Sequence, residues 1–373
     1  PADAVVMSWR GAQGAIDAAR GGHDVVLSPS PQLYLDHLQS DAPDEPPGRP
    51  DVVGLADVYA FTVVPPALEA DAARHVLGAQ ANLWTEHMRT PERVEHAAFP
   101  RLAALAEVLW TPPARRGWQG FVARLGPQMD RYRALGVDAA DSAFEVRFGE
   151  DADAGAVTVT LSDQAGLPIR YTRDGREPTA ASPLYSAPLR LERPATLRAA
   201  AFLGTRALGA RRRDYAADEI ARRSSDALKQ CSGKLTLRLE DDAPGDDGRR
   251  ARFDVDLFDP CWIWPQAPLA HASRLAARVG QLPYNFQLGK DAANVVPRPP
   301  PASADGELIV RLDTCSGPTL VALPLAAAAA SRGTTTLAAD LPRQDGPHDL
   351  CFVFSGRGSD PLWAIDDVRL LPR

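Results

Sequence analysis

The segment 81–86 carries side chains of the types and spacing that bind a sugar. An apolar run that starts at His75 ends in Trp84 and Glu86, and a helix is expected directly afterwards, over 91–110. A strand of an α/β barrel delivers its last side chains to the functional rim in this way. The indole offers a flat apolar face to a pyranose ring, and the carboxylate accepts hydrogen bonds from hydroxyls. For this segment alone, a core tryptophan beside a surface glutamate is the favoured interpretation.

Two earlier apolar runs end in the same kinds of residue. The first ends in Trp9 and is followed by a helical pattern over 11–22 with a Gly-Gly stop. The second, 23–29, opens into a loop that carries Tyr34 and Asp36. This alternation of strands and helices predicts a parallel sheet, and functional groups gather at the carboxyl ends of its strands. We therefore expect five side chains on one rim: Trp9, Tyr34, Asp36, Trp84 and Glu86.

The motifs of this region resemble a known catalytic domain. They are the segments 6–11, 22–29, 34–36, 81–86 and 99–110. In this order they resemble the last part of the catalytic barrel of the family 20 glycoside hydrolases, the β-N-acetylhexosaminidases. The resemblance extends from residue 3 to about residue 137. It implies that residues 1–137 form the carboxyl-terminal part of a (β/α)8 barrel.

The same resemblance implies a role for each of the five rim residues. Trp9 and Trp84 would line the pocket that holds a terminal N-acetylhexosamine. Tyr34 would hydrogen-bond the acetamido carbonyl and hold it in place for reaction. Asp36 and Glu86 would bind outer hydroxyls of the same sugar.

The chemistry that the resemblance implies is substrate-assisted and retaining. The acetamido oxygen of the substrate attacks the anomeric carbon, so no nucleophilic carboxylate and no cofactor are needed. An adjacent Asp-Glu pair completes the site: the Asp orients the acetamido group and the Glu protonates the leaving oxygen. In the family, this pair and a sugar-binding Arg lie on earlier barrel strands, which we expect to precede this chain.

Two Asp-Glu dipeptides do occur in the chain, but neither has the context of a catalytic pair. Asp44-Glu45 lies in a Pro-rich loop with no apolar strand before it. Asp218-Glu219 opens a polar stretch that resembles the solvated start of a helix. A complete barrel takes about 250 residues, far more than the barrel-like part here. We therefore expect a carboxyl-terminal fragment that lacks the catalytic pair and is inactive by itself.

Beyond residue 137 the helical periodicity gives way to alternating strands. Residues 150–215 resemble the immunoglobulin-like domain at the carboxyl end of chitobiases and hexosaminidases, through the pattern Tyr-Thr-Xaa-Asp-Gly-Xaa-Xaa-Pro-Thr at 171–179. A packing or spacing role is favoured there over sugar contact. The Arg- and Asp-rich segment 211–230 is predicted to link domains.

Residues 232–373 are predicted to form a terminal β-sandwich. From residue 306 onward they resemble family 6 carbohydrate-binding modules, and in such modules an Asp of the terminal strand helps to bind a structural calcium. Asp366 is the candidate for that role here. Four aromatic residues either pack in the core, which is favoured, or form a sugar platform: Trp262, Trp264, Tyr284 and Phe286.

The four cysteines all lie in this terminal region, at positions 231, 261, 315 and 351. No two are separated by two residues, so their spacing does not fit a zinc site. An even number in one β region predicts disulfides and an oxidising compartment, periplasmic or secreted. Free buried cysteines in a cytosolic protein are the alternative. The pairing stays open, because four cysteines allow three connectivities.

Composition excludes several classes of protein. The chain has 373 residues, 45% of them hydrophobic, which fits two or three packed domains. The net charge of −7 and the lack of a basic stripe argue against nucleic acid as a partner. The longest apolar run, 320–330, is too short for a membrane span and contains Pro324.

The sequence therefore predicts a multidomain α/β plus all-β protein. Its parts are the barrel portion (1–137), the immunoglobulin-like β-sandwich (150–215) and the terminal β-sandwich (232–373). The predicted parent is an exo-acting β-N-acetylhexosaminidase acting on oligosaccharides or glycoconjugates that contain N-acetylhexosamine. Preference for GlcNAc or GalNAc stays open. The alternative is a non-catalytic carbohydrate-binding protein.

Overall fold

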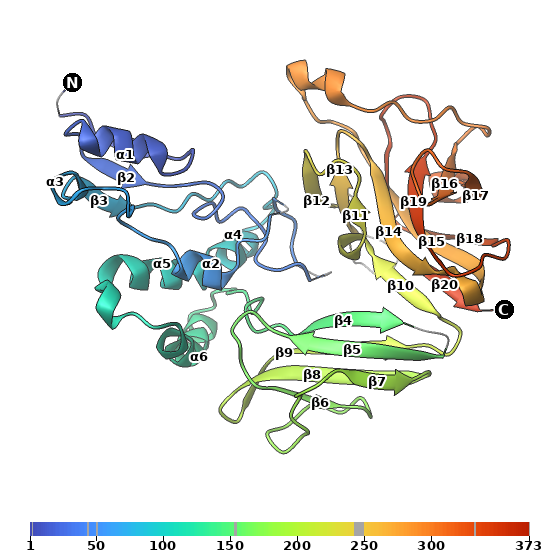
Figure 1. Cartoon of the computed structure of the whole chain (residues 1–373), viewed down its shortest axis with the longest axis horizontal. Helices are drawn as coiled ribbons and strands as arrows, with labels where there is room; N and C mark the ends of the chain where they lie inside the picture. The colour runs from blue at the N-terminus through green and yellow to red at the C-terminus, as the bar shows by residue number, and fades with distance from the viewer. Residues whose placement is uncertain are drawn as a thin grey trace.

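The computed structural model describes residues 1–373 apart from 2, 43, 44, 50, 153, 154, 242–249, 332 and 373. Three regions follow one another along the chain: an α/β region (blue to teal in Figure 1), a small β region (green) and a larger β region (yellow to red). No helix of the described residues is long and apolar enough to cross a membrane.

The α/β region contains a parallel sheet in the order β1 (Val6–Ser8), β2 (Val25–Leu27), β3 (Val76–Ala79). The connection from β1 to β2 runs through helix α1 (Gln13–Arg20). Gly22, just beyond this helix, has φ +84°, a left-handed conformation that favours glycine and ends the helix. Three strands with a helical crossover fit part of a barrel, as the sequence predicts.

The two faces of this sheet differ. Val25 and Leu27 of β2 are buried in a core that includes Ala15 and Ala19 of α1. Four apolar side chains of β1, β3 and their flanks are instead exposed: Val5, Met7, Trp9 and Leu77. Because side chains alternate along a strand, Val5, Met7 and Trp9 project from a single face of the sheet. Among the described residues, that face therefore carries large apolar groups without a covering layer.

The helices of this region differ from prediction at one point. They are α2 (Leu55–Tyr59), α3 (Ala70–Ala73), α4 (Pro91–Ala98), α5 (Arg101–Trp110) and α6 (Trp118–Ala134). The single helix predicted over 91–110 is wrong, because it breaks at Phe99, which is extended (φ −107°, ψ 141°). Pro100 causes the break: proline lacks an N–H and disfavours the helical conformation of the preceding residue.

The small β region is a pair of antiparallel three-stranded sheets. One sheet has β4 (Arg147–Ala152), β5 (Ala156–Ser162) and β7 (Leu189–Glu192), and the other has β6 (Ile169–Thr172), β8 (Ala195–Leu203) and β9 (Arg206–Tyr215). Inward residues such as Val157, Val159 and Leu197 form the core between them. The segment 211–230 does connect the two β regions, as predicted, but the link itself is shorter, because β9 continues to Tyr215 and β10 of the terminal region starts at Ala221.

The terminal region packs a four-stranded and a five-stranded sheet around one core. The first has β10 (Ala221–Ser224), β20 (Leu362–Pro372), β15 (Ala272–Leu282) and β18 (Thr335–Asp340). The second has β11 (Lys229–Gln230), β14 (Cys261–Pro268), β19 (Pro347–Phe354), β16 (Glu307–Leu312) and β17 (Thr319–Pro324). A hairpin of β12 (Thr236–Glu240) and β13 (Arg252–Asp256) and a short helix, α7 (Ala326–Ala329), complete the region. Trp262 and Trp264 are buried, which confirms core packing for this pair.

The predicted disulfides are present in the terminal region. Cys231 pairs with Cys261, and Cys315 pairs with Cys351, a connectivity that the sequence left open. The two bonds lie side by side, since the four sulfur atoms are all within 4.8 Å of one another. The bonds join segments that are distant in sequence to the central strands β14 and β19.

Candidate active site

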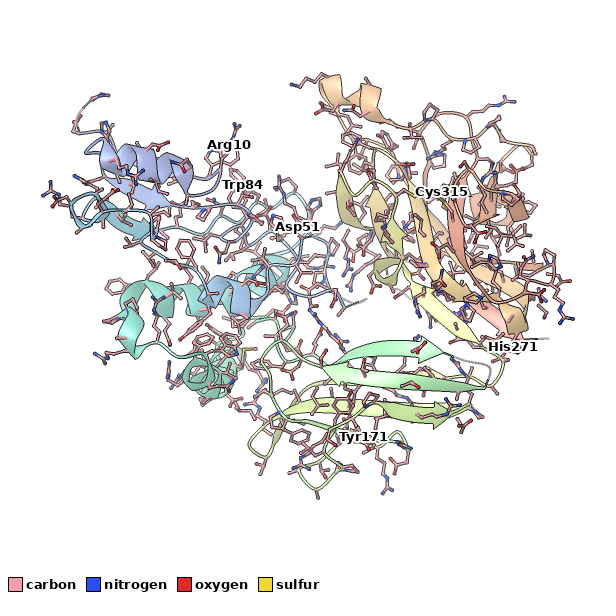
Figure 2. All side chains as sticks on the ribbon, in the orientation of Figure 1. Arg10, Asp51, Trp84, Tyr171, His271 and Cys315 are labelled. Carbon is pink, nitrogen blue, oxygen red and sulfur yellow. A yellow bond between two sulfur atoms is a disulfide. The ribbon has the colours of Figure 1, made fainter. Side chains whose placement is uncertain are left out.

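The carboxyl ends of the three parallel strands form one rim, and hydrogen bonds extend the strands' alignment beyond their ends. The N–H of Ser30 donates to the carbonyl of Trp9 at 2.9 Å. Asn82 donates from its side chain to the hydroxyl of Ser28 at 2.6 Å. The predicted residues that follow β1, β2 and β3 are therefore held along the same edge of the sheet. Figure 2 shows Trp84 and Arg10 on this edge, which faces the terminal region.

Trp9 and Trp84 are the exposed aromatic residues of the rim. Their exposed fractions are 47% and 53%, so the interpretation of Trp84 as a core residue is wrong. The guanidinium carbon of Arg10 lies 4.5 Å from the centre of the Trp9 ring. An exposed indole is costly in water and provides a stacking surface for the apolar face of a sugar ring.

Tyr34 lies on a segment that pairs with the chain beyond β3. Tyr34 and Asn82 form a parallel β-bridge, and the N–H of Leu35 donates to the carbonyl of Asn82 at 2.7 Å. Tyr34 is buried, with 7% of its surface exposed. This pairing brings the loop after β2 to within two residues of Trp84, so the rim is a continuous surface and not three separate loops.

Asp36 is a buried carboxylate that forms an ion pair but accepts no hydrogen bond within the described parts of the chain. Its exposed fraction is 3%, and Arg49 forms an ion pair with it at 3.1 Å between Nε and Oδ2. Neither carboxylate oxygen has a hydrogen-bond partner among the described residues. Buried polar groups normally find partners, because leaving them without one costs free energy. Asp36 is therefore suited to accept hydrogen bonds from the hydroxyls of a ligand.

Arg101, to which the sequence analysis assigned no role, fixes the position of Asp36. Its buried guanidinium donates to the carbonyls on either side of Asp36, those of Leu35 (2.6 Å) and His37 (3.0 Å). It also donates to the carbonyl of Val53 at 2.8 Å. Burial lowers the pKa of Arg101 to about 9. The signal in the sequence was an arginine directly after Pro100, the residue that precedes α5.

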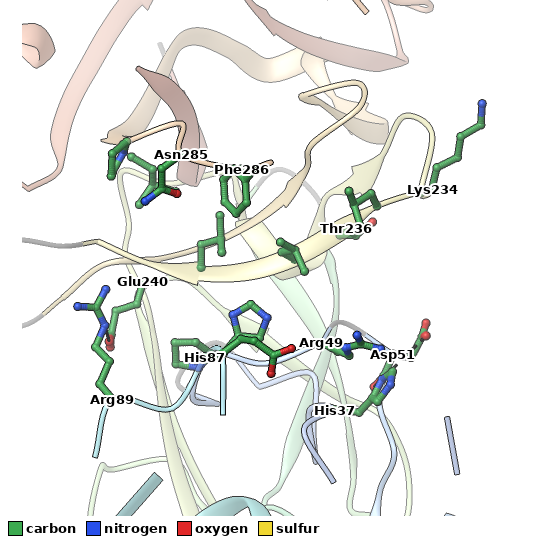
Figure 3. A pocket seen from close by; sticks show the side chains of 18 residues that line it. His37, Arg49, Asp51, His87, Arg89, Lys234, Thr236, Glu240, Asn285 and Phe286 are labelled. Carbon is green, nitrogen blue, oxygen red and sulfur yellow. Dashed lines mark hydrogen bonds and ion pairs between the residues drawn. The ribbon is translucent and has the colours of Figure 1, made fainter. Parts of the chain in front are cut away.

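Glu86 is exposed and is one of the residues that line a cavity of about 740 Å³ (Figure 3). Arg49 and His87, which the sequence analysis also did not single out, line this cavity with it. Burial lowers the pKa of the His87 imidazole, so the ring is predominantly neutral at neutral pH. The cavity therefore places hydroxyl-binding groups of both charges and a neutral imidazole next to the rim.

The two Asp-Glu dipeptides do not form a catalytic pair on the rim. Asp44 lies outside the described residues. Glu45 is buried and accepts hydrogen bonds from the hydroxyls of Ser40 (2.7 Å) and Ser142 (2.8 Å), and His96 lies 3.2 Å away. Asp218 and Glu219 lie in a turn between β9 and β10, so the predicted helix start there is wrong.

Asp366, the calcium candidate, lies on β20 and forms an ion pair with Arg278. Burial raises the pKa of this carboxyl group. The four cysteines are the one group of three or more close candidate metal ligands within the described parts of the chain. Calcium binding by Asp366 therefore stays a prediction.

Two family models match the chain. The glycosyl hydrolase family 20 catalytic domain matches residues 1–113, and the chitobiase/β-hexosaminidase C-terminal domain matches residues 152–210. The chain is therefore similar to glycosyl hydrolase family 20 over the first of these segments. All five rim residues lie within the segment that matches the catalytic domain. The segment from 211 to the end lies outside both matches.

Curated proteins similar to this chain include two β-hexosaminidases. The β-hexosaminidase of Porphyromonas gingivalis is 40% identical over 195 residues, which are 50% of this chain and 24% of that protein. That of Vibrio furnissii is 38% identical over 106 residues, 28% of this chain and 17% of that protein. A solved family 20 exo-β-N-acetylglucosaminidase from Vibrio harveyi, in complex with N-acetylglucosamine, is 34% identical over 36% of this chain and 22% of its own, with a TM-score of 0.35. The chain spans 24% or less of these two curated relatives.

Proposed function

We propose that this chain contributes one side of the sugar pocket of a β-N-acetylhexosaminidase, which releases terminal N-acetyl-β-D-hexosamine residues. The observation that carries the proposal is Asp36, a buried carboxylate with unused hydrogen-bonding capacity, on a rim between exposed tryptophans. The family match over residues 1–113 and the named activity of the relatives support it.

In this proposal each rim residue binds or orients the substrate. Trp9 and Trp84 stack against the apolar face of the terminal sugar, while Asp36 and Glu86 accept hydrogen bonds from its outer hydroxyls. Tyr34 donates a hydrogen bond to the acetamido carbonyl and holds that oxygen against the anomeric carbon. The acetamido oxygen forms the new bond to the anomeric carbon as the bond to the leaving oxygen breaks.

The leaving oxygen needs a proton, and we propose that the acid comes from outside residues 1–373. Glu45 is unsuitable, because it is buried in a hydrogen-bonded cluster with Ser40, Ser142 and His96. General acid catalysis typically contributes about 10²–10⁴-fold to the rate. The chain alone should therefore bind the sugar without turning it over. The two disulfides favour a periplasmic or secreted location.

A hydrolysis assay with an aryl N-acetyl-β-glucosaminide tests whether this chain binds the sugar while the general acid comes from elsewhere. We expect no turnover above a buffer blank from the chain alone, and activity from the full-length parent. In the parent, Trp84→Ala should weaken sugar binding and Tyr34→Phe should mainly lower kcat. Trp110→Ala, which removes an exposed tryptophan at the end of α5, is the matched control. Unchanged kinetics in both rim variants would contradict the assignment.

The second candidate function is a non-catalytic sugar-binding protein. It is favoured by the lack of an Asp-Glu pair at the rim among the described residues. A full-length parent without hydrolytic activity, but with Trp84-dependent sugar binding, would establish this alternative.

A further inference from the structure

The four cysteines form a compact cluster of sulfur atoms, although they come from four separate segments of the terminal region. Cys231 directly follows β11, Cys261 begins β14, Cys351 lies in β19, and Cys315 lies in the loop after β16 (Figure 2). All four sulfur atoms are within 4.8 Å of one another. The Sγ of Cys315 lies 3.6 Å from that of Cys231 and 4.0 Å from that of Cys261, in the other disulfide. The two disulfides therefore share one site.

Strand pairing brings Cys231, Cys261 and Cys351 together. β11 pairs with the start of β14, and β14 pairs with β19. Cys351 is opposite Ile263 in that pairing, and Cys261 projects from the same face of the sheet two residues earlier. The core of the region, which includes Trp262, lies on the other face. The hydrogen bonds of this sheet do not involve sulfur, so the arrangement does not depend on the disulfides.

The loop that carries Cys315 is held by backbone contacts of its own. The N–H of Asp313 donates to the carbonyl of Asp349 on β19 at 2.7 Å, and Nη1 of Arg311 donates to the carbonyl of Gly317 at 2.9 Å. These bonds tie both ends of the loop to the sheet independently of the disulfide. The guanidinium of Arg311 also brings a positive charge to the loop, and a nearby cation favours the thiolate form of cysteine.

Four sulfur atoms at these spacings match the ligand set of a structural zinc site. Zinc takes four thiolates in a tetrahedron with Zn–S distances of about 2.3 Å, so neighbouring sulfur atoms are about 3.8 Å apart. The separations of 3.6 and 4.0 Å between the two disulfides are close to this value. The Cα atoms of the two disulfides are 5.7 and 5.1 Å apart, which leaves room for the sulfur atoms to separate once each bond is broken.

We propose that the reduced chain binds one zinc ion through Cys231, Cys261, Cys315 and Cys351, and that the oxidised chain holds the two disulfides instead. A reductant of the dithiol or phosphine class supplies two electrons to each disulfide, and uptake of protons gives four thiols. Zinc binding then releases these protons and forms the Zn–S bonds. The same sulfur atoms serve both states, so each state excludes the other. The redox conditions during folding therefore decide whether disulfides or a metal cross-link the terminal region.

Titration of the reduced chain with Co²⁺, which absorbs strongly in the visible range when four thiolates surround it, tests this. The chain is reduced with a phosphine, which has no thiol to compete for the metal, and oxygen is excluded. We expect saturation at one Co²⁺ per chain, displacement by Zn²⁺, and no such spectrum from the oxidised chain. Zn²⁺ should also raise the Tm of the terminal transition in the reduced chain, because a metal that binds only the folded state stabilises it.

Two serine variants and one control locate the metal. Cys231→Ser and Cys315→Ser each remove one ligand at a partly buried position, where the change disturbs packing least. Each should weaken Co²⁺ binding at least about 100-fold, because even the outer partners of metal ligands contribute about 10–100-fold to affinity. Ser316→Ala changes an exposed neighbour of Cys315 and keeps all four sulfur atoms, so it should bind Co²⁺ as the wild type does.

Several results would overturn the zinc site. One is a reduced wild-type chain that shows neither the Co²⁺ spectrum nor the rise in Tm with Zn²⁺. Another is unchanged Co²⁺ affinity in both serine variants, or equal binding by the oxidised chain, since either would place the metal elsewhere. If the terminal region unfolds on reduction, Zn²⁺ should restore its transition, and a failure to do so also contradicts the site. The proposed sugar pocket does not depend on any of these outcomes.

Discussion

The α/β region and the terminal β region bury their apolar side chains in different ways. In the terminal region two sheets enclose one core, so strands β14 and β19 present their apolar residues to a facing sheet. In the α/β region one face of the sheet is covered by α1 and its neighbours, while Val5, Met7 and Leu77 are exposed on the other side. Parallel sheets are normally covered on both faces. The comparison teaches that the terminal region covers its own core, whereas the sheet of the α/β region leaves apolar side chains exposed on one face among the described residues.

Limited proteolysis should give the largest difference between the two regions. A partly covered parallel sheet opens more readily than a closed sandwich, so the α/β region should be digested first. We expect a resistant product that starts within 144–157 and runs through the terminal region. Mass spectrometry of the products checks this. A protected amino-terminal product with the terminal region digested would reverse the comparison.

Reduction of the two disulfides should destabilise the terminal region and leave the α/β region unaffected. The two disulfides close loops with sequence separations of 30 and 36 residues. Loops of this size typically contribute about 2–4 kcal/mol each to the free energy of unfolding. Calorimetry with and without dithiothreitol should show a lower Tm for the terminal transition only. An unchanged terminal transition would mean that its core is stable without the bonds.

Replacement of Arg101 should destabilise the α/β region alone. Arg101→Leu would leave the buried carbonyls of Leu35, His37 and Val53 without this donor, at a cost of roughly 1–3 kcal/mol for each unsatisfied group. Chemical denaturation should show a loss of at least about 3 kcal/mol in the first transition. The exposed Arg115→Leu is the control. A loss under 1 kcal/mol would indicate that water or a rearranged loop replaces the guanidinium.

A smaller effect on stability is expected when Glu45 of the α/β region is protonated at low pH. Burial alone would raise the pKa of Glu45, but hydrogen bonds from His96, Ser40 and Ser142 outweigh it and lower the pKa below 4.5. The ionised group therefore stabilises the fold above the unfolded pKa, and this contribution is lost as the pH falls below about 4.5. In Glu45→Gln, stability of the α/β region should fall less steeply over this range. If the stability of the variant and of the wild type fell equally steeply with pH, this role of Glu45 would be ruled out.

Much of the rim could be predicted from sequence because its residues follow local apolar runs. Trp9 and Trp84 stand where such runs end, and Tyr34 follows the middle strand. The role of Arg101 could not be predicted in this way, because its partners at 35, 37 and 53 lie far away in the chain. The contact between the terminal region and the α/β region could not be predicted either, because Arg238 donates a hydrogen bond to Ala42, 196 residues away in the sequence. Periodicity describes single elements, whereas such contacts arise only when the elements pack.

The central claim is that the rim binds an N-acetylhexosamine through Asp36. The most direct test is the Kd of GlcNAc for the wild-type chain and for Asp36→Asn, with Asp24→Asn, at the amino end of β2, as the control. A hydrogen bond to a charged group contributes about 1.5–3 kcal/mol, so Asp36→Asn should weaken binding at least about tenfold. Asp24→Asn should leave the Kd unchanged. Equal affinities of wild type and Asp36→Asn would contradict the account.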